Sequence, residues 1–211
     1  MSQQSHPRSP ATLDFFHGTM GASKTAHMVM SVYKARQEGK NVLAMKPYID
    51  TRYGDANTII SRVAQLSIPA DVVIKTVHDV YSVNWNNYSQ AYCDEIHFLK
   101  EDVIQAFRKV VDIYNVSIKC YGLKTNFMRR QFEGSARMID LATNCNEITS
   151  ECVACGCKSE FNLRYQNGKP LYNGDEIVLG DETDNFPVQY ASVCSHHYNN
   201  PTFIIQSGET Q

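Results

Sequence analysis

Residues 18–25 read GTMGASKT, and they restrict the fold of this chain more than any other stretch. They nearly match the phosphate-binding loop G-x-x-x-x-G-K-[ST], in which backbone N–H groups and the N-terminus of the next helix surround a phosphate. An apolar run at Thr12–Phe16 precedes them and a helix-like run follows, so the expected strand–loop–helix context is present. The pattern makes Gly18 the start of the loop, Lys24 its cation and Thr25 its Mg²⁺-binding hydroxyl.

Ser23 departs from this pattern, because the loop usually has glycine there. Glycine is favoured where the backbone adopts a positive φ or approaches a ligand closely. We expect serine to fit if Ser23 keeps an ordinary helical conformation, although its side chain would crowd the phosphate. The alternative is a glycine-bearing turn that Ser23 caps, with Lys24 present by chance.

Short apolar runs alternate with helix-like stretches up to about residue 144. The clearest helix spans residues 100–115, with Asp102 near the positive end of the helix dipole. Its apolar face comprises Val103, Ile104, Phe107, Val111 and Tyr114. Strands that alternate with helices predict a parallel sheet covered by helices. The predicted strands are residues 13–16, 41–45, 71–74 and 116–123.

The pattern changes beyond this point. Clustered cysteines and turn-rich segments such as YQNGKP and GDETDNFP lie between short strand-like runs. Such a pattern is typical of a small β module. The sequence therefore predicts a flexible tail (1–11), an α/β domain (12–145), a β module (146–200) and a second tail (201–211).

The composition restricts partners and compartment. The chain has 211 residues, and 22 acidic against 20 basic residues argue against a nucleic-acid partner. No stretch approaches the roughly 18 apolar residues of a membrane span. The first residues lack the apolar core of a secretory signal, and seven cysteines without such a signal favour a reducing cytoplasm and metal binding over disulfides.

Two adjacent carboxylates, Asp94 and Glu95, follow a short predicted strand that ends in Cys93. In nucleotide kinases and ATPases an acidic residue at a strand end holds Mg²⁺, and a neighbouring carboxylate accepts the proton of an attacking hydroxyl. The alternative is a solvated acidic pair in a loop or a helix-capping aspartate. We expect Cys93 to be a core residue.

Four residues near the C-terminus have the spacing of a structural zinc site. Cys152 and Cys155 form a C-x2-C pair, and Cys194 and His197 form a C-x2-H pair. Two such pairs on β-hairpins give closed tetrahedral coordination, which organises a fold and leaves no position for chemistry. The alternative is a set of reduced structural thiols.

Other residues compete for these roles. Cys157 and His196 lie close to the proposed ligands, but the x2 spacing favours the four named above. Cys120 and Cys145 are expected to be ordinary buried thiols.

Five motifs together resemble one family. They are GTMGASKT, KPYIDTRYG at 46–54, DEIHFL at 94–99, YGLKTNFMRRQFEGS at 121–135 and the cysteine-rich C-terminal segment. In this order and spacing they resemble the type II thymidine kinases, from about residue 13 to residue 198. The resemblance implies a RecA-like P-loop α/β domain with a parallel sheet, a small C-terminal zinc-ribbon β module and a lasso loop that covers the substrate.

The resemblance also implies an activity, the transfer of the γ-phosphate of ATP to the 5′-hydroxyl of thymidine or deoxyuridine. Glu95 would be the general base, and Thr25, Asp94 and Asp50 would hold Mg²⁺. Mg²⁺ with ATP and structural Zn²⁺ are the implied cofactors, and a homotetramer is the implied assembly. The implied ATP-binding residues are Gly18, Thr19, Met20, Gly21, Ala22, Ser23, Lys24, Thr25, Arg52 and Asp94. From the residues alone, Asp50 and Arg52 would form a solvent-facing salt bridge.

Thymidine pockets in this family are apolar and aromatic, and backbone groups read the base edge. Aromatic rings offer a flat base a large contact area at little entropic cost. The alternative for each position is core packing. Phe127 and Phe132 differ, because they lie in a polar stretch where exposed aromatics need another explanation. The matching positions are Met20, Phe98, Leu123, Phe127, Phe132 and Tyr190, with backbone contacts from the lasso around Val178.

Three departures from the family pattern surround the nucleoside site. His97 replaces the usual glutamine, Lys124 replaces a commonly acidic residue, and the lasso segment GDETDNFPVQY is longer. They bear on substrate identity more than on fold. Two other functions stay open: a RecA-like ATPase with a DNA-binding zinc ribbon, which the near-neutral charge disfavours, and a nucleotide-binding kinase homologue impaired by Ser23.

Overall fold

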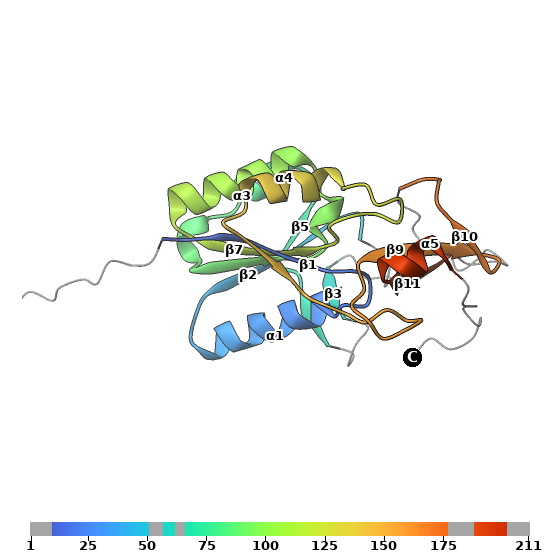
Figure 1. Cartoon of the computed structure of the whole chain (residues 1–211). Coiled ribbons are helices and arrows are strands. Elements are labelled where there is room, and N and C mark those ends of the chain that lie inside the picture. The colour runs from blue at the N-terminus through green and yellow to red at the C-terminus, as the bar shows by residue number, and fades with distance from the viewer. Residues whose placement is uncertain (1–9, 51–56, 62–65, 177–187, 202–211) are drawn as a thin grey trace, which may run out of the picture.

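Six parallel strands form one sheet in the computed structural model, which describes residues 10–50, 57–61, 66–176 and 188–201 (Figure 1). Every pair of neighbouring strands is parallel, so the predicted parallel sheet is confirmed. Residues 1–9 and 202–211 of the predicted tails lie outside the described residues. The strands, in order across the sheet, are β5 (Val72–Ile74), β2 (Val42–Pro47), β6 (Gln90–Cys93), β7 (Ser117–Gly122), β1 (Leu13–His17) and β8 (Asn144–Glu147).

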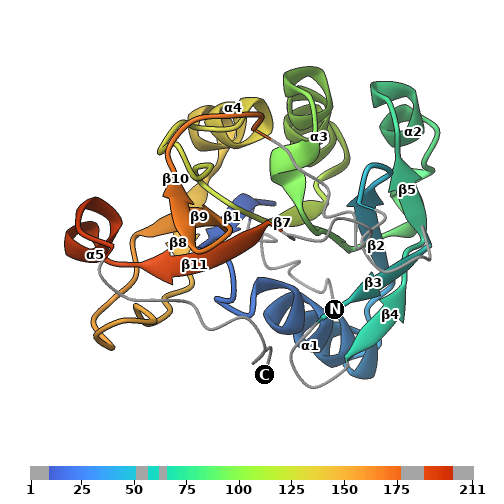
Figure 2. The same cartoon turned by 90° about the vertical axis from the view of Figure 1, so that its right-hand side faces the viewer.

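Helices cover both faces of this sheet. Their bounds are α1 (Lys24–Gln37), α2 (Val77–Tyr81), α3 (Glu101–Tyr114) and α4 (Glu133–Leu141), with 3-10 turns η1 (Trp85–Asn87) and η2 (Ile96–Phe98). Figure 2 shows α2, α3 and α4 on one face and α1 on the other. The hairpin of β3 (Thr58–Ile60) and β4 (Ser67–Pro69) packs on the α1 side. No helix among the described residues has the length and apolarity to cross a membrane.

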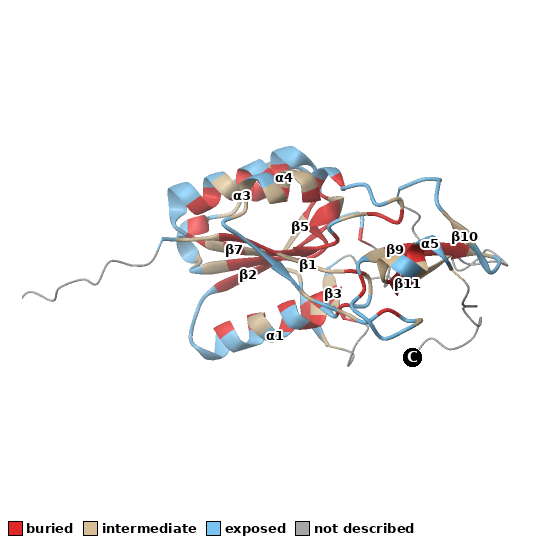
Figure 3. Ribbon diagram, in the orientation of Figure 1, coloured by how far each residue is buried: buried red, intermediate tan, exposed pale blue. Residues whose placement is uncertain are grey.

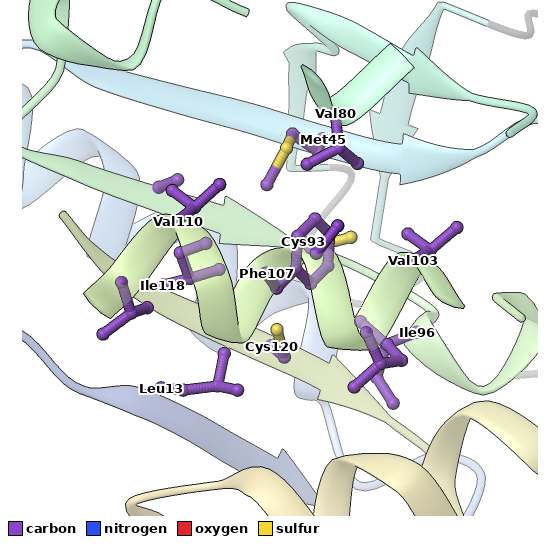
Figure 4. Packing of buried hydrophobic residues seen from close by; sticks show 14 of the residues in the cluster. Leu13, Met45, Val80, Cys93, Ile96, Val103, Phe107, Val110, Ile118 and Cys120 are labelled. Atoms are coloured by element: carbon purple, nitrogen blue, oxygen red, sulfur yellow. The ribbon is translucent and has the colours of Figure 1, made fainter. Parts of the chain in front are cut away.

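Alternating side chains of the central strands supply two separate cores. In β1, Leu13 and Phe15 are fully buried on the side of α3 and α4, whereas Phe16 packs against the core on the α1 side. Figure 4 shows Phe107 of α3 among side chains from β1, β2, β6 and β7. Because helices cover both faces, the central strands are largely buried (Figure 3).

The helix α3 follows its predicted pattern except at its end. Its first-turn acids, Glu101 and Asp102, lie at the positive end of the helix dipole. Four of the five residues of the predicted apolar face are buried. Tyr114 is 43% exposed instead, because it is the last residue of the helix and the chain turns away at the left-handed Asn115.

A second, smaller sheet lies beyond the carboxyl ends of the parallel strands (Figure 1). It has its own core, which includes Leu163, Val193 and Tyr198, and corresponds to the predicted β module. Its antiparallel strands are, in order, β10 (Lys169–Leu171), β9 (Phe161–Gln166) and β11 (Gln189–Val193), and the helix α5 (Ser195–Asn199) follows.

The strand β8 carries the chain from one sheet to the other. It pairs with β1 as the edge of the parallel sheet, so it crosses the predicted boundary at residue 145. The Ile148 N–H then donates a 2.7 Å hydrogen bond to the carbonyl of His17. The entry to the β module therefore runs beside the end of β1, where the GTMGASKT loop begins.

Gly134 lets α4 approach η2 closely, because a Cβ there would lie 2.5 Å from the carbonyl oxygens of both Ile96 and Leu99. We predict that Gly134→Ala lowers the free energy of unfolding by about 1–3 kcal/mol. Alanine favours a helix by about 1 kcal/mol over glycine, but two backbone oxygens cannot move aside as a side chain can. Thermal unfolding measures the change. Arg137→Ala on the same helix is the control, and a Gly134→Ala protein as stable as that control would contradict the prediction.

Candidate active site

The carboxyl ends of the parallel strands bring the GTMGASKT loop and the acidic pair together. The loop follows β1 and Asp94 follows β6, with β7 between these strands. The Thr25 hydroxyl donates a 2.8 Å hydrogen bond to Oδ2 of Asp94, although the two residues are 69 positions apart. They meet at the edge where open α/β sheets place their ligand sites.

Ser23 has a left-handed backbone, with φ of 56° and ψ of 27°. The expectation of an ordinary helical conformation is therefore wrong. A non-glycine residue costs on the order of 1 kcal/mol in this region, so serine keeps the loop shape under strain. Its side chain makes no capping hydrogen bond to α1, so it does not form the capped turn considered as the alternative. Gly21 supplies the other positive φ of the loop, 78°.

Lys24 lies folded against its own loop. Its ammonium donates a 2.7 Å hydrogen bond to the carbonyl of Thr19, and the residue is 9% exposed. The Ala22 N–H donates to the same carbonyl at 3.3 Å. The loop thus encloses a cation next to the N-terminus of α1, and both attract an anion.

Glu95 also has a positive φ, of 48°, and directly precedes η2. Its Oε2 lies 3.4 Å from Nδ1 of His97, and the Leu123 amide nitrogen lies 3.2 Å from the same ring nitrogen. Because the amide donates to Nδ1, the neutral ring carries its proton on Nε2.

Asp50 follows β2, the strand next to β6. Its buried carboxylate lies 3.4 Å from Nζ of Lys46, which also donates to the carbonyl of Thr58 at 3.0 Å. This enclosed ion pair differs from the solvent-facing salt bridge that the sequence alone suggested. Arg52, the partner in that suggestion, lies outside the described residues.

One group of predicted nucleoside residues surrounds His97. The ring centroids of Phe98 and Phe132 lie 4.1 and 4.8 Å from that of His97. Leu123 joins the group through its amide. Phe132 is 4% exposed, so the expectation of an exposed ring is wrong.

A second group meets at Arg164. The guanidinium carbon lies 3.6 Å from the centroid of the Phe127 ring, and Nε donates a 2.9 Å hydrogen bond to the hydroxyl of Tyr190. Phe127 is 2% exposed, so it too is buried, contrary to expectation. Val178, the predicted source of backbone contacts, lies outside the described residues.

Two side chains of the β module, Asn162 and Ser192, hold the loop but were not predicted from the sequence. Met20 donates its backbone N–H to Asn162 and accepts a hydrogen bond from the Ser192 hydroxyl at its carbonyl. No motif marks Asn162 or Ser192. The only signal is the alternation of polar and apolar residues along β9, which separates Asn162 from the module's own core.

The four predicted zinc ligands converge, with donor atoms within 4.8 Å of one another. Cys155 Sγ lies 3.9 Å from Cys194 Sγ, and His197 Nδ1 lies 3.6 Å from Cys152 Sγ and 3.3 Å from Cys194 Sγ. A tetrahedral ion with Zn–S bonds of about 2.3 Å separates its sulfur ligands by roughly 3.8 Å. The residues therefore fit a zinc ion.

Cys152 favours the thiolate form that zinc binds. Burial alone would raise the pKa of its thiol, but hydrogen bonds from the backbone of Cys194, Ala154 and Cys155 outweigh burial and lower the pKa to about 6. At this one donor, less proton competition therefore opposes metal binding, whereas hydrogen bonds among the neighbouring thiols raise the pKa of Cys155 and Cys194.

The remaining cysteines fall into two kinds. Burial raises the pKa of the Cys93 and Cys120 thiols, and both are core residues as predicted. Cys145 is exposed, so the expectation of a buried thiol is wrong there, because every residue of the edge strand β8 is exposed. Cys157 is also exposed and lies outside the group of four donors.

We predict about one tightly bound zinc per chain, as in structural sites. Cys194→Ser removes one of four donors and should abolish stoichiometric zinc. Cys157→Ser changes a neighbouring exposed thiol and should leave the zinc content unchanged. Metal analysis of protein purified without chelators checks both, and a wild type without zinc would reject the site.

Two solved structures resemble the chain weakly. The Pif1 helicase of Candida albicans aligns with a TM-score of 0.41 and 10% identity, over 66% of this chain and 36% of that chain. A Bacteroides Pif1 bound to single-stranded DNA aligns with a TM-score of 0.32 and 16% identity, over 55% of this chain and 29% of that chain. At these values the likeness has no bearing on function.

Similarity in sequence is much more extensive. A thymidine kinase of Streptococcus agalactiae is 34% identical over 195 residues, which cover 90% of this chain and 98% of the relative. A thymidine kinase of Streptococcus pyogenes is 34% identical over 197 residues, with the same coverage of both chains. The family model "Thymidine kinase" matches residues 11–198. With its loop, acidic pair and Cys/His cluster all inside that match, this chain belongs to the thymidine kinase family.

Proposed function

We propose that this enzyme transfers the γ-phosphate of ATP to the 5′-hydroxyl of thymidine or deoxyuridine, with Glu95 as general base. Membership of the thymidine kinase family supports thymidine phosphorylation in general. The contact between Thr25 and Asp94 carries the rest of the proposal. It joins a loop suited to phosphates to an acidic pair suited to Mg²⁺ and to proton transfer.

Thr25 and Asp94 fit a magnesium site. Neighbouring ligands of octahedral Mg²⁺, with bonds of about 2.1 Å, lie roughly 3.0 Å apart. The two oxygens are 2.8 Å apart, so both can enter one coordination sphere with little movement. Thr25 and Asp94 would hold the ion beside the phosphates of ATP, where it would neutralise their negative charge. Asp50 would join this set from the end of β2, where Lys46 holds its carboxylate.

Lys24 would serve the phosphates directly. Its ammonium now bonds the Thr19 carbonyl, and it would exchange that bond for charge-assisted bonds to phosphate oxygens. The N–H groups in the first turn of α1 form the positive end of the helix dipole, so they also stabilise negative charge on a phosphate there. Arg52 is proposed to add a further cation.

Glu95 is proposed to accept the proton in the transfer step. The 5′-oxygen forms a bond to the γ-phosphorus, the bond between that phosphorus and the leaving ADP oxygen breaks, and the hydroxyl proton passes to the carboxylate. His97 lies beside the proposed base, with its Nδ1 3.4 Å from Oε2 of Glu95 and within hydrogen-bond distance of the Leu123 amide.

The nucleoside is proposed to bind among the two aromatic groups described above. Phe98 and Phe132 lie beside His97, two residues from the base Glu95, and Tyr190 is tied to Arg164. A DNA-binding ribbon is less well supported, because Arg164 is buried against Phe127 and the guanidinium of Arg129 lies 3.7 Å from the Tyr198 ring centroid. These cations stack on the protein's own rings.

Replacing Glu95 with glutamine keeps the side chain's shape and removes the proton acceptor. Loss of a general base typically costs about 10²–10⁴ in rate. We predict such a fall in kcat for Glu95→Gln, with thymidine affinity within about threefold of wild type. Glu133 is an exposed acid at the start of α4 that pairs with Lys100. Glu133→Gln is the matched control and should turn over normally. Undiminished turnover in Glu95→Gln would reject Glu95 as the base.

Ser23→Gly should relieve the strain of the left-handed serine and raise the free energy of unfolding by about 1 kcal/mol. We predict that the wild type binds Mg·ATP and that Ser23→Gly binds it equally well or up to tenfold more tightly. Lys24→Ala should lose most of the affinity. Calorimetric titration compares the three proteins. If only Ser23→Gly binds ATP, the wild type is an impaired homologue and the proposed activity fails.

A further inference from the structure

Met20, the third residue of the loop, is held by two opposing residues of the β module. The Met20 N–H donates a 2.7 Å hydrogen bond to Oδ1 of Asn162, and the Met20 carbonyl accepts one from the Ser192 hydroxyl. Asn162 and Ser192 lie opposite each other in the pairing of β9 with β11. Both are buried, so water does not compete for these bonds.

The second residue, Thr19, is held by a closed ring of hydroxyls. Its Oγ1 lies 2.6 Å from Oγ of Ser150 and 2.8 Å from Oγ of Ser159, and the two serines lie 2.6 Å apart. Each hydroxyl can donate one bond and accept another around the ring, so all three are satisfied together. The ring ties Thr19 to the segment that leads into β9.

The first residue, Gly18, lies against the same segment. A Cβ at this position would be 2.3 Å from the carbonyl oxygen of Ile148, so only glycine permits this approach. Residues 18, 19 and 20 are therefore each in contact with the chain beyond β8.

These contacts bear on the strained serine. A left-handed non-glycine residue persists only where the surrounding structure over-determines it. On one side of Ser23 the loop is anchored to the β module through Met20. On the other side α1 begins, and the His27 N–H donates to the Ser23 carbonyl at 3.0 Å. The strained residue lies between two fixed ends.

We infer that Asn162 and Ser192 are positioning residues for ATP, because they hold the loop in the shape that requires Ser23 to be left-handed. The inference rests on the ATP site proposed above. It gives the β module a role at the phosphates, in addition to any role at the nucleoside.

The test is a double-substitution cycle, read by calorimetric titration with Mg·ATP in the absence of nucleoside. Ser192→Ala removes the donor to Met20 and should weaken ATP binding about fivefold to tenfold. In the Ser23→Gly background the same substitution should weaken it less than about twofold, since glycine adopts the left-handed conformation without support. A bond that only fastens the module to the domain would cause equal losses in both backgrounds.

Matched variants separate this effect from a general loss of structure. Ser192→Thr keeps the hydroxyl and should bind ATP like wild type. Ser117→Ala removes a hydroxyl that accepts the Thr12 N–H at the opposite end of β1, and should have no effect on ATP. Asn162→Leu, which lacks the acceptor, repeats the cycle at the other bond. Zinc content and the unfolding transition show that each protein is folded.

The outcomes distinguish this inference from the proposed function. If the wild type binds Mg·ATP and Ser192→Ala binds it equally well, or loses the same factor in both backgrounds, the inference is overturned and the proposed activity stands. If the wild type does not bind Mg·ATP, both are overturned.

Discussion

The parallel register of β6, β7 and β1 is the constraint on which the rest of the site depends. Parallel strands end at one edge of a sheet, so the loop after β1 and the acids after β6 must lie close together. The close-packed cores on both faces fix where these strands end, since protein interiors leave few voids into which a strand can shift. The distance between the Thr25 hydroxyl and the Asp94 carboxylate is therefore set by apolar packing far from either side chain.

Two of the five non-glycine residues with positive φ in the described part of the chain lie at this same edge. Ser23 and Glu95 are both non-glycine residues with positive φ, and each directly precedes a helical turn. Glycine would relax either position, but glycine at 95 would remove the carboxylate. The strain at Glu95 accompanies an acid that directly precedes a helical turn. Strained residues cluster at functional sites, so it agrees with the role proposed for Glu95. Ser23 differs, because its hydroxyl has no comparable assigned task, and its conformation depends on neighbours that hold the loop.

Local sequence patterns predicted the features that depend on residues close together in the chain. Apolar runs located the strands, and the two x2 pairs located four donors that the fold brings together. Burial was harder to predict, because it depends on distant segments. Phe127 and Phe132 sit among polar neighbours but turn inward onto Arg164 and His97. In β9 the polar residues Asn162 and Arg164 alternate with apolar ones, as in a strand with one solvent-exposed face. That face is covered instead, partly by a loop 142 positions earlier in the chain, and nothing in β9 itself records this.

The bond between Ser192 and Met20 joins residues 172 positions apart. Synthesis releases β1, the loop and α1 from the ribosome early, whereas the residues that fix the loop are released near the end. Contacts of such long range also form slowly, because a long segment must be closed, at a cost in entropy, before they contribute. A nascent or C-terminally shortened chain with an intact parallel sheet would therefore carry the complete GTMGASKT sequence but lack the side chains that give it one shape.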